Sequence, residues 1–241
     1  MLLGLAFGVA LAGVVTMAGT ARQAEAAFTE KIVFSSTRTT GTGVNNPTGD
    51  YEIFTMNPDG TGLKQLTANT ATDLDPVLSS DGTKIAYQSY GTQTSYPEGD
   101  SEVYRMNALD GSSKKNLTDN GTGVKDLDPV LSPDGTKIAY ESYGIQSSNP
   151  EGDSEIYRIN VTDGLGKKNL SDNGADVYEQ YPVYSPGGGK IAYMSYGIQP
   201  SSNPEGDEEV YRMNASDGSS KKNLSDNAAG DGYAVWGVQS T

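Results

Sequence analysis

The stretch Pro129-Val-Leu-Ser-Pro-Asp-Gly-Thr-Lys-Ile-Ala-Tyr140, followed by Glu155-Ile-Tyr-Arg-Ile-Asn-Val-Thr-Asp-Gly164, decides the fold of this chain of 241 residues. Its Lys-Ile-Ala-Tyr element recurs every 53 residues, beginning at Lys84, Lys137 and Lys190, and a Lys-Ile-Val-Phe version begins at Lys31. Self-similarity at a fixed period of this size is the sequence signature of a repeat architecture.

Each repeat has the sequence features of four short strands. Residues 85–90 are rich in β-branched and aromatic side chains, and residues 102–106 alternate in character with period 2. Tight turns are indicated by Asp81-Gly82 between the first two strands and by Asp110-Gly111 between the last two. The chain after residue 27 contains no convincing amphipathic helix pattern. Four-stranded units in tandem are propeller blades, so we predict an all-β fold.

The repeat resembles that of the TolB-like (WD-type, PD-type) β-propeller family, whose pattern runs Pro-x-Trp-Ser-Pro-Asp-Gly-Lys-x-Ile-Ala-Phe, then Glu-Ile-Tyr-x-Met-Asn-x-Asp-Gly, then Leu-Thr. The resemblance covers residues 28–241. Here Leu78, Leu131 and Tyr184 stand where the pattern has Trp, residues 186–189 read Pro-Gly-Gly-Gly, and each repeat carries an inserted loop. The resemblance implies a binding or scaffolding protein of the cell envelope, or an accessory domain of a peptidase.

We predict a single domain over residues 28–241, a β-propeller of four four-stranded blades of about 53 residues each. The domain begins at a second strand, residues 30–35, while Tyr233-Ala-Val-Trp236 matches the first strand Tyr181-Pro-Val-Tyr184. We therefore expect the C-terminal strand, residues 233–238, to complete the N-terminal blade, in a monomer. The alternative is an open arc that pairs with a second chain to give eight blades, a dimer. The expected blades are 28–67 plus 233–238, 75–118, 128–171 and 181–225.

Residues 1–27 form a separate segment that is almost wholly apolar from Leu2 to Ala18. Ala24-Glu25-Ala26 matches a cleavage pattern, so we predict a signal peptide and a protein that is secreted or lies in the periplasm or cell envelope. A membrane anchor is the alternative, but the run is short and Gly-rich for a span. We expect no membrane insertion after cleavage.

Composition restricts the possible functions. The net charge of −14 disfavours nucleic acid as a partner. The chain has no Cys and no His, which excludes disulfides, thiolate chemistry and a Ser-His-Asp triad. Nearly identical repeats also make asymmetric acid–base pairs hard to build. We therefore expect a binding module and not an enzyme, with a metal-dependent propeller lyase or lactonase as the alternative.

The acidic residues are expected to gather on one face, where the strand-two to strand-three loops lie, and the lysine pairs 114–115, 167–168 and 221–222 on the opposite face. A Gly-Asp-x-Glu element recurs in every repeat. It could be a strand-entry turn whose Glu is solvated or pairs with a nearby Arg, a Ca²⁺ site through the four aspartates, or a docking surface for a basic protein or peptide. The candidate ligand-binding residues are Asp50, Glu52, Asp100, Glu102, Asp153, Glu155, Asp207 and Glu209, and the candidate Ca²⁺ ligands are Asp50, Asp100, Asp153 and Asp207.

Tyr90, Tyr143 and Tyr196 each precede a Gly at the start of the inserted loop, with Gln three residues further on. Exposed Tyr beside amides suits a sugar ring, so these residues are candidates for a carbohydrate-binding propeller. The alternative, which we favour, is that these rings pack between blades with the hydroxyl group at the edge.

Overall fold

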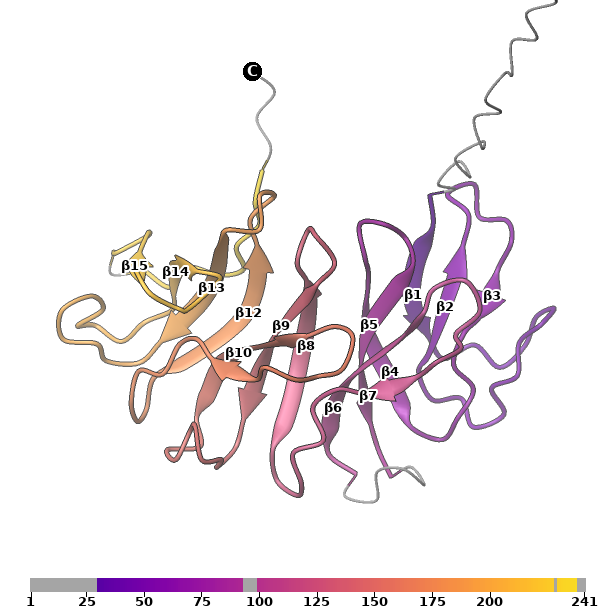
Figure 1. The fold of residues 1–241 in the computed structure, drawn as a ribbon, viewed down its shortest axis with the longest axis horizontal. Helices are drawn as coiled ribbons and strands as arrows, with labels where there is room; N and C mark the ends of the chain where they lie inside the picture. Colours follow the sequence, from indigo (N-terminus) through magenta and orange to yellow (C-terminus); the bar gives the residue numbers. More distant parts are fainter. Residues whose placement is uncertain (1–29, 93–98, 228, 238–241) are drawn as a thin grey trace, which may run out of the picture.

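The computed structural model describes residues 30–92, 99–227 and 229–237. In these ranges the chain forms antiparallel sheets and no helix, which confirms the predicted all-β propeller of four blades. The sheets stand side by side in chain order along an arc (Figure 1). The predicted signal peptide, residues 1–27, lies outside the described residues. None of the described residues belongs to a helix long and apolar enough to span a membrane.

Each sheet is built from strands that are consecutive in the chain. Blade one contains β1 (Ile32–Ser36), β2 (Glu52–Met56) and β3 (Lys64–Gln65). Blade two contains β4 (Thr72–Leu78), β5 (Lys84–Tyr90), β6 (Ser101–Asn107) and β7 (Lys115–Asn116). Blade three contains β8 (Lys125–Leu131), β9 (Lys137–Tyr143), β10 (Ser154–Asn160) and β11 (Lys168–Asn169). Blade four contains β12 (Tyr178–Tyr184), β13 (Lys190–Tyr196), β14 (Glu209–Asn214) and β15 (Lys222–Asn223).

The predicted Asp-Gly turns join the first two strands of blades two and three. In blade three the backbone N–H of Gly135 donates to the Ser132 carbonyl at 2.8 Å, and Gly135 has a φ of 68°. The Asp134 carboxylate accepts from the backbone N–H of Thr136 at 3.0 Å and from the Ser132 hydroxyl at 2.6 Å. A side chain that closes its own turn in this way defines the register of the strands on either side.

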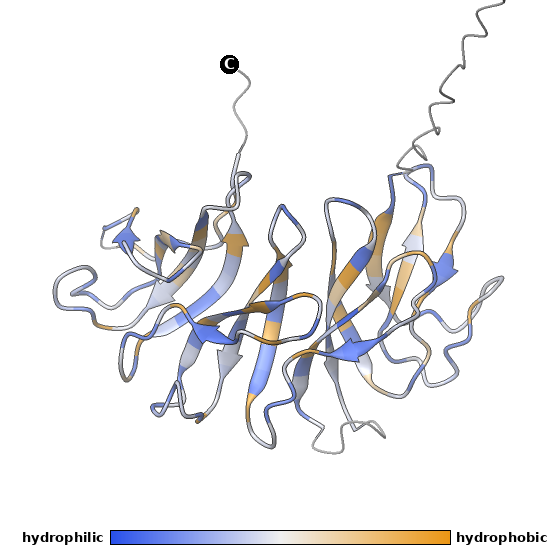
Figure 2. Cartoon of the chain, in the orientation of Figure 1, coloured by the Kyte–Doolittle hydropathy of each residue, from blue (hydrophilic) through white to orange (hydrophobic). Residues whose placement is uncertain are grey.

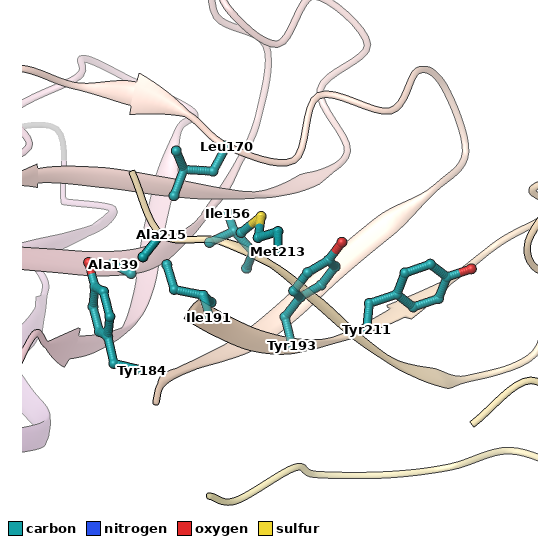
Figure 3. Packing of buried hydrophobic residues seen from close by; sticks show 9 residues of the cluster. All are labelled: Ala139, Ile156, Leu170, Tyr184, Ile191, Tyr193, Tyr211, Met213 and Ala215. Carbon is teal, nitrogen blue, oxygen red and sulfur yellow. The ribbon is translucent and has the colours of Figure 1, made fainter. Parts of the chain in front are cut away.

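Hydrophobic residues occur along the strands of every blade (Figure 2), and their side chains form a core between the blades (Figure 3). Figure 3 shows Ile156 and Leu170 of blade three facing Ile191 and Met213 of blade four. Both faces of a central strand are therefore covered, which is why β9 is buried at five consecutive positions and not at every second one. The predicted core residues of the second strands are confirmed as buried: Ile85, Tyr87, Ile138, Tyr140, Ile191 and Tyr193. Val77, Val130 and Val183 are half-buried.

The prediction that the C-terminal strand completes the first blade is wrong for the described residues. Blade one has three strands, and residues 229–237 form no strand. They lie instead along the far end of the arc, where the Trp236 indole N–H donates to the Val183 carbonyl at 3.1 Å and the ring of Tyr233 contacts that of Tyr181 at 4.5 Å. Blade one and blade four lie at opposite ends of the arc (Figure 1), so the C-terminal residues that contact β12 do not reach β1.

The predicted blade boundaries need a small correction as well. The first strands begin at Thr72, Lys125 and Tyr178, three residues before the predicted starts at 75, 128 and 181. Each strand bends at a β-bulge just before its proline, so pairing with the second strand extends to both sides of the bend.

Candidate functional site

The Gly-Asp-x-Glu element leads into the third strand of each four-stranded blade and into β2, the equivalent strand of blade one. Its glutamate is buried in every blade. The Glu102 carboxylate accepts a hydrogen bond from the Thr118 hydroxyl and a second, at 3.3 Å, from the backbone N–H of Asn120. The fourth strand and the segment after it are thus fastened to the third strand. The alternative in which this glutamate is solvated is wrong, because the fourth strand and the segment after it cover the carboxylate, in blade four as well as in the others. The four glutamates, each at most 2% exposed, are Glu52, Glu102, Glu155 and Glu209.

The nearby arginines serve the blade interfaces. A guanidinium nitrogen of Arg105 donates to the Thr162 carbonyl at 3.0 Å, and one of Arg158 donates to the Ala215 carbonyl at 2.7 Å. Both acceptors belong to a turn region of the following blade, so each arginine ties two blades together in place of pairing with the glutamate of its own strand.

The first strand of the next blade places a second buried acid near each of Glu52, Glu102 and Glu155. These second acids are Asp73, Asp126 and Glu179. The Asn120 side chain donates to Asp126, and the Asn69 side chain donates to Asp73 at 2.9 Å. Burial raises the pKa of Glu52 to about 7 and that of Asp126 to about 6. Sequence reasoning missed these polar junctions, although a recurring Asn two residues after each Leu-Thr or Leu-Ser pair was a signal: Asn69, Asn120, Asn173 and Asn227.

The first lysine of each pair reaches these junctions. The Lys167 ammonium group donates to the Asn120 side chain and, at 2.7 Å, to that of Gln146. Lys221 donates to the Asn173 side chain at 3.1 Å. The predicted separation of acidic and basic faces is therefore wrong for these lysines, since their long side chains run between the blades to the polar junctions, where the charge of Lys167 partly offsets the raised pKa of Asp126.

The four candidate aspartates sit at equivalent places in four different blades. The Asp100 carboxylate accepts from the backbone N–H of Gly123 at 2.7 Å, and the Asn149 side chain donates to the Asp153 carbonyl at 2.7 Å. The second is a contact of a strand-entry turn, whereas the first joins the entry of β6 to the segment before β8 of the next blade. No three acidic side chains in the described parts of the chain come together as metal ligands. Binding of Ca²⁺ by Asp50, Asp100, Asp153 and Asp207 stays a prediction.

A row of strained residues lies on the inner side of the arc, where β8 contacts both β4 and β12. Asp75, Asp128 and Tyr181, here called the inner row, occupy the bulge of each first strand and have φ values of 49°, 50° and 53°. Each precedes a proline. Positive φ is costly for residues other than Gly, and such strain concentrates at functional sites.

The inner row carries an unbalanced negative field. Burial, together with the charge of Asp75, raises the pKa of Asp128 to about 6. Burial and the charge of Asp128 raise the pKa of Glu141 to about 7, even though the Ser154 hydroxyl donates to Glu141 at 2.6 Å. Three acids from two blades thus act on one another, which is the environment that a bound cationic group would relieve.

The candidate tyrosines end the second strands. Tyr90 is 52% exposed and Tyr143 is 45% exposed, so the favoured expectation that these two pack between blades is wrong. Tyr196 stacks on Tyr178 of its own sheet, with ring centroids 4.9 Å apart. Two of the neighbouring glutamines turn back to the strands: Gln146 donates to the Ser142 hydroxyl at 2.6 Å and Gln199 to the Ser195 hydroxyl at 2.9 Å, while Gln93 lies outside the described residues. Carbohydrate binding by these residues stays a prediction.

A hollow of about 590 Å³ lies at the turns between blades three and four, where the Pro-Gly-Gly-Gly turn departs from the repeat. Lys137, Arg158 and Tyr184 line it. Both cationic groups already donate within the protein, Lys137 to the Asn160 side chain and Arg158 to the Ala215 carbonyl. The inner row is the stronger candidate site because its charges are not balanced in this way.

Comparison with known proteins places this geometry among propellers. The chain is 32% identical over 152 residues to a Protein TolB homolog of Chlorobium luteolum, covering 63% of this chain and 30% of that protein. The structure of TolB from Acinetobacter baumannii superposes with a TM-score of 0.55 at 22% identity, over 80% of this chain and 41% of that one. A putative TolB from Agrobacterium tumefaciens gives the same TM-score and identity over 73% and 57%. The chain spans about a third of the length of the Chlorobium relative.

The repeat, the four-bladed arc and these likenesses agree with one further match. The family model described as the TolB beta propeller domain matches residues 23–235, nearly the whole described structure. The chain therefore belongs to the TolB β-propeller domain family.

Proposed function

We propose that this chain is a non-enzymatic binding module, and that its ligand is a protein or peptide segment whose positively charged group docks on the inner row. The observation that carries this proposal is the placement of Asp75 and Asp128 at equivalent positive-φ bulges of the adjacent strands β4 and β8, and the pKa of Asp128, raised by burial and by the charge of Asp75, supports it. A lysine or arginine side chain placed there would neutralise both carboxylates and restore the lost solvation by charge-assisted hydrogen bonds.

The inner row is well built for such docking. Its carboxylates are set by bulges in paired strands, so little ordering entropy is lost on binding. Tyr181 and the ring of Tyr233, with centroids 4.5 Å apart, extend the row with an aromatic surface, over which a cation or a peptide side chain packs favourably.

A location in the periplasm or cell envelope is part of the proposal. The apolar stretch Leu2 to Ala18, followed by a cleavage pattern, supports export. Family membership agrees with a binding or scaffolding role, and the chain contains no His or Cys with which to build the commonest catalytic centres.

The experiment is a titration with a short arginine-containing peptide, compared with a neutral peptide of the same length, by calorimetry. The test variant is Asp75→Asn with Asp128→Asn. The matched control is Glu151→Gln with Glu205→Gln, which removes two charges from exposed loop positions. We expect the test variant to weaken binding of the arginine peptide about tenfold, equivalent to about 1.4 kcal/mol, and the control to change it little.

The pH dependence gives a second readout. Because Asp128 has a pKa of about 6, its charge is present at pH 7.5 and mostly lost at pH 5, so wild-type binding should weaken on acidification. The double Asp→Asn variant should lose most of this dependence. Equal weakening in the two double variants would mean that the peptide senses only net charge, and would refute a site at the inner row.

A further inference from the structure

The arc ends in two faces that are each half of a blade interface. Leu66, Leu117 and Leu170 occupy equivalent positions in blades one to three and are 3–6% exposed, because the following blade covers them. Leu224 is their counterpart in blade four and is 48% exposed. The described structure therefore leaves the outer face of blade four without the neighbour that its sequence is built for.

Blade one presents the complementary half. Ile85, Ile138 and Ile191 are fully buried against the preceding blade, whereas their counterpart Ile32 is 40% exposed. Met56, the counterpart of the buried Met106, is half-buried. In the complete interface between blades three and four, Leu170 belongs to the same cluster as Ile191 and Met213. Leu224 at one end of the arc thus matches Ile32 and Met56 at the other.

Residues 231–236 stand where the first strand of a fifth blade would stand. The Asn227 side chain donates to Asp231 at 2.6 Å, which repeats the contact of Asn120 with Asp126. Tyr233 and Trp236 contact β12 through the Tyr181 ring and the Val183 carbonyl, while Val235 is 87% exposed. Within the described residues, this segment occupies the place of an inner strand but pairs with no second strand, and β1 is a second strand that pairs with no inner strand.

We propose that the two ends of the arc join between copies of this chain: the outer face of blade four and residues 231–236 of one copy receive the three-stranded blade one of a second copy. In the complete blades, Val77, Val130 and Val183 lie opposite Ala86, Ala139 and Ala192. By the same register, Val235 of one copy lies opposite Val33 of the other.

Two copies are the number that closes the ring. The two ends lie at opposite sides of the arc (Figure 1), so a single copy does not close. Two four-bladed arcs make eight blades, which is within the usual range of four to eight, and three arcs would make twelve. Because each junction pairs a face with a different face, a head-to-tail contact that closes after two copies leaves no free end.

The first test is the mass of the purified chain by light scattering after size-exclusion chromatography. We expect twice the monomer mass for the wild-type chain. Leu224→Lys should raise the dissociation constant of the dimer at least tenfold, because it places a charge in the apolar junction. Leu165→Lys is the matched control, since Leu165 is also exposed, at 66%, but lies on a turn away from either end face.

The second test uses engineered thiols, which are unambiguous because the chain has no Cys. Val33→Cys and Val235→Cys variants are purified separately, mixed and oxidised. Directly opposed residues on paired strands have Cβ atoms about 4.5–5.5 Å apart, so a disulfide between the copies can form. We expect a covalent dimer from the mixture, and none when Leu165→Cys replaces Val235→Cys.

These outcomes decide the proposal in combination. A monomeric wild-type chain overturns it, and so does a dimer that Leu224→Lys leaves intact, because the contact would then use another surface. If Val33→Cys does not fold, the Leu224→Lys comparison alone still decides, since it changes only an exposed position.

Discussion

The buried carboxyl group of Asp126, at the junction between blades two and three, leads to a quantitative prediction for the variant Asp126→Asn. Asp126 is fully buried, and its pKa rises from the ordinary value of 3.8 to about 6, chiefly because burial penalises the charged form. A group whose pKa is raised on folding stabilises the fold fully below its unfolded pKa. That contribution is lost as the pH rises through the folded pKa.

The magnitude follows from the two pKa values. A rise from 3.8 to about 6, at about 1.36 kcal/mol for each pH unit, corresponds to about 3 kcal/mol of unfolding free energy that Asp126 gives up between pH 3.8 and pH 7. Asparagine has nearly the same shape and no titration, so the variant should lack this part of the slope. Its uncharged amide also removes the attraction between the Asp126 carboxylate and Lys167, which stabilises the folded wild type at high pH.

The assay is urea denaturation of the two proteins at pH 4.5, 6 and 8, with the unfolding free energy obtained by linear extrapolation. The wild type should lose more stability than Asp126→Asn between pH 4.5 and pH 8. Asp163→Asn, at an exposed turn position, is the control and should follow the wild type. Parallel pH dependences for the wild type and Asp126→Asn would refute the assignment of a raised pKa to this carboxyl group.

Two further predictions concern the turns and the cation question. A Cβ atom at Gly164 would lie 2.3 Å from the Leu117 carbonyl oxygen of the preceding blade, whereas one at Gly135, with a similar φ, would meet open space. In thermal or urea unfolding, Gly164→Ala should therefore cost at least about 3 kcal/mol and Gly135→Ala about 1 kcal/mol, and equal losses would contradict the close packing of this turn. If the four aspartates bind Ca²⁺, a hundredfold excess over Kd should stabilise the fold by about 2.7 kcal/mol, and the melting temperature should rise more than in NaCl of the same ionic strength. Equal shifts in the two salts, or no loss of the difference when all four Asp are changed to Asn, would contradict Ca²⁺ binding there.

Much of the blade was readable in the sequence because its features are local. The alternating residues 102–106 and the turn at Asp134-Gly135 each depend on a few neighbouring residues, and the structure places strands and turns at these positions. The burial of Ile138 and Tyr140 also follows from the sequence, since the second strand of each propeller blade lies between neighbouring sheets.

The candidate site was only partly readable. The recurring acids were visible, but their environments were not, because burial depends on the neighbouring blade. One alternative had Glu102 solvated or paired with an arginine, and it is covered, while Tyr143 was expected to pack between blades and is nearly half exposed. The row formed by Asp75, Asp128 and Tyr181 arises from bulges in three separate strands, whose residues lie 53 positions apart in the chain.

By itself, the sequence determined the number of repeats, the strands of each blade and the core residues of the second strands, because short-range patterns encode these. Only the tertiary structure decided whether the ring closes. Closure depends on the angle between successive sheets summed over all junctions, and each angle is set by how side chains such as Tyr140 and Leu117 fill the space between blades. Residues 233–236 therefore match a first strand in sequence and lie beside β12, but within the described residues they pair with no second strand.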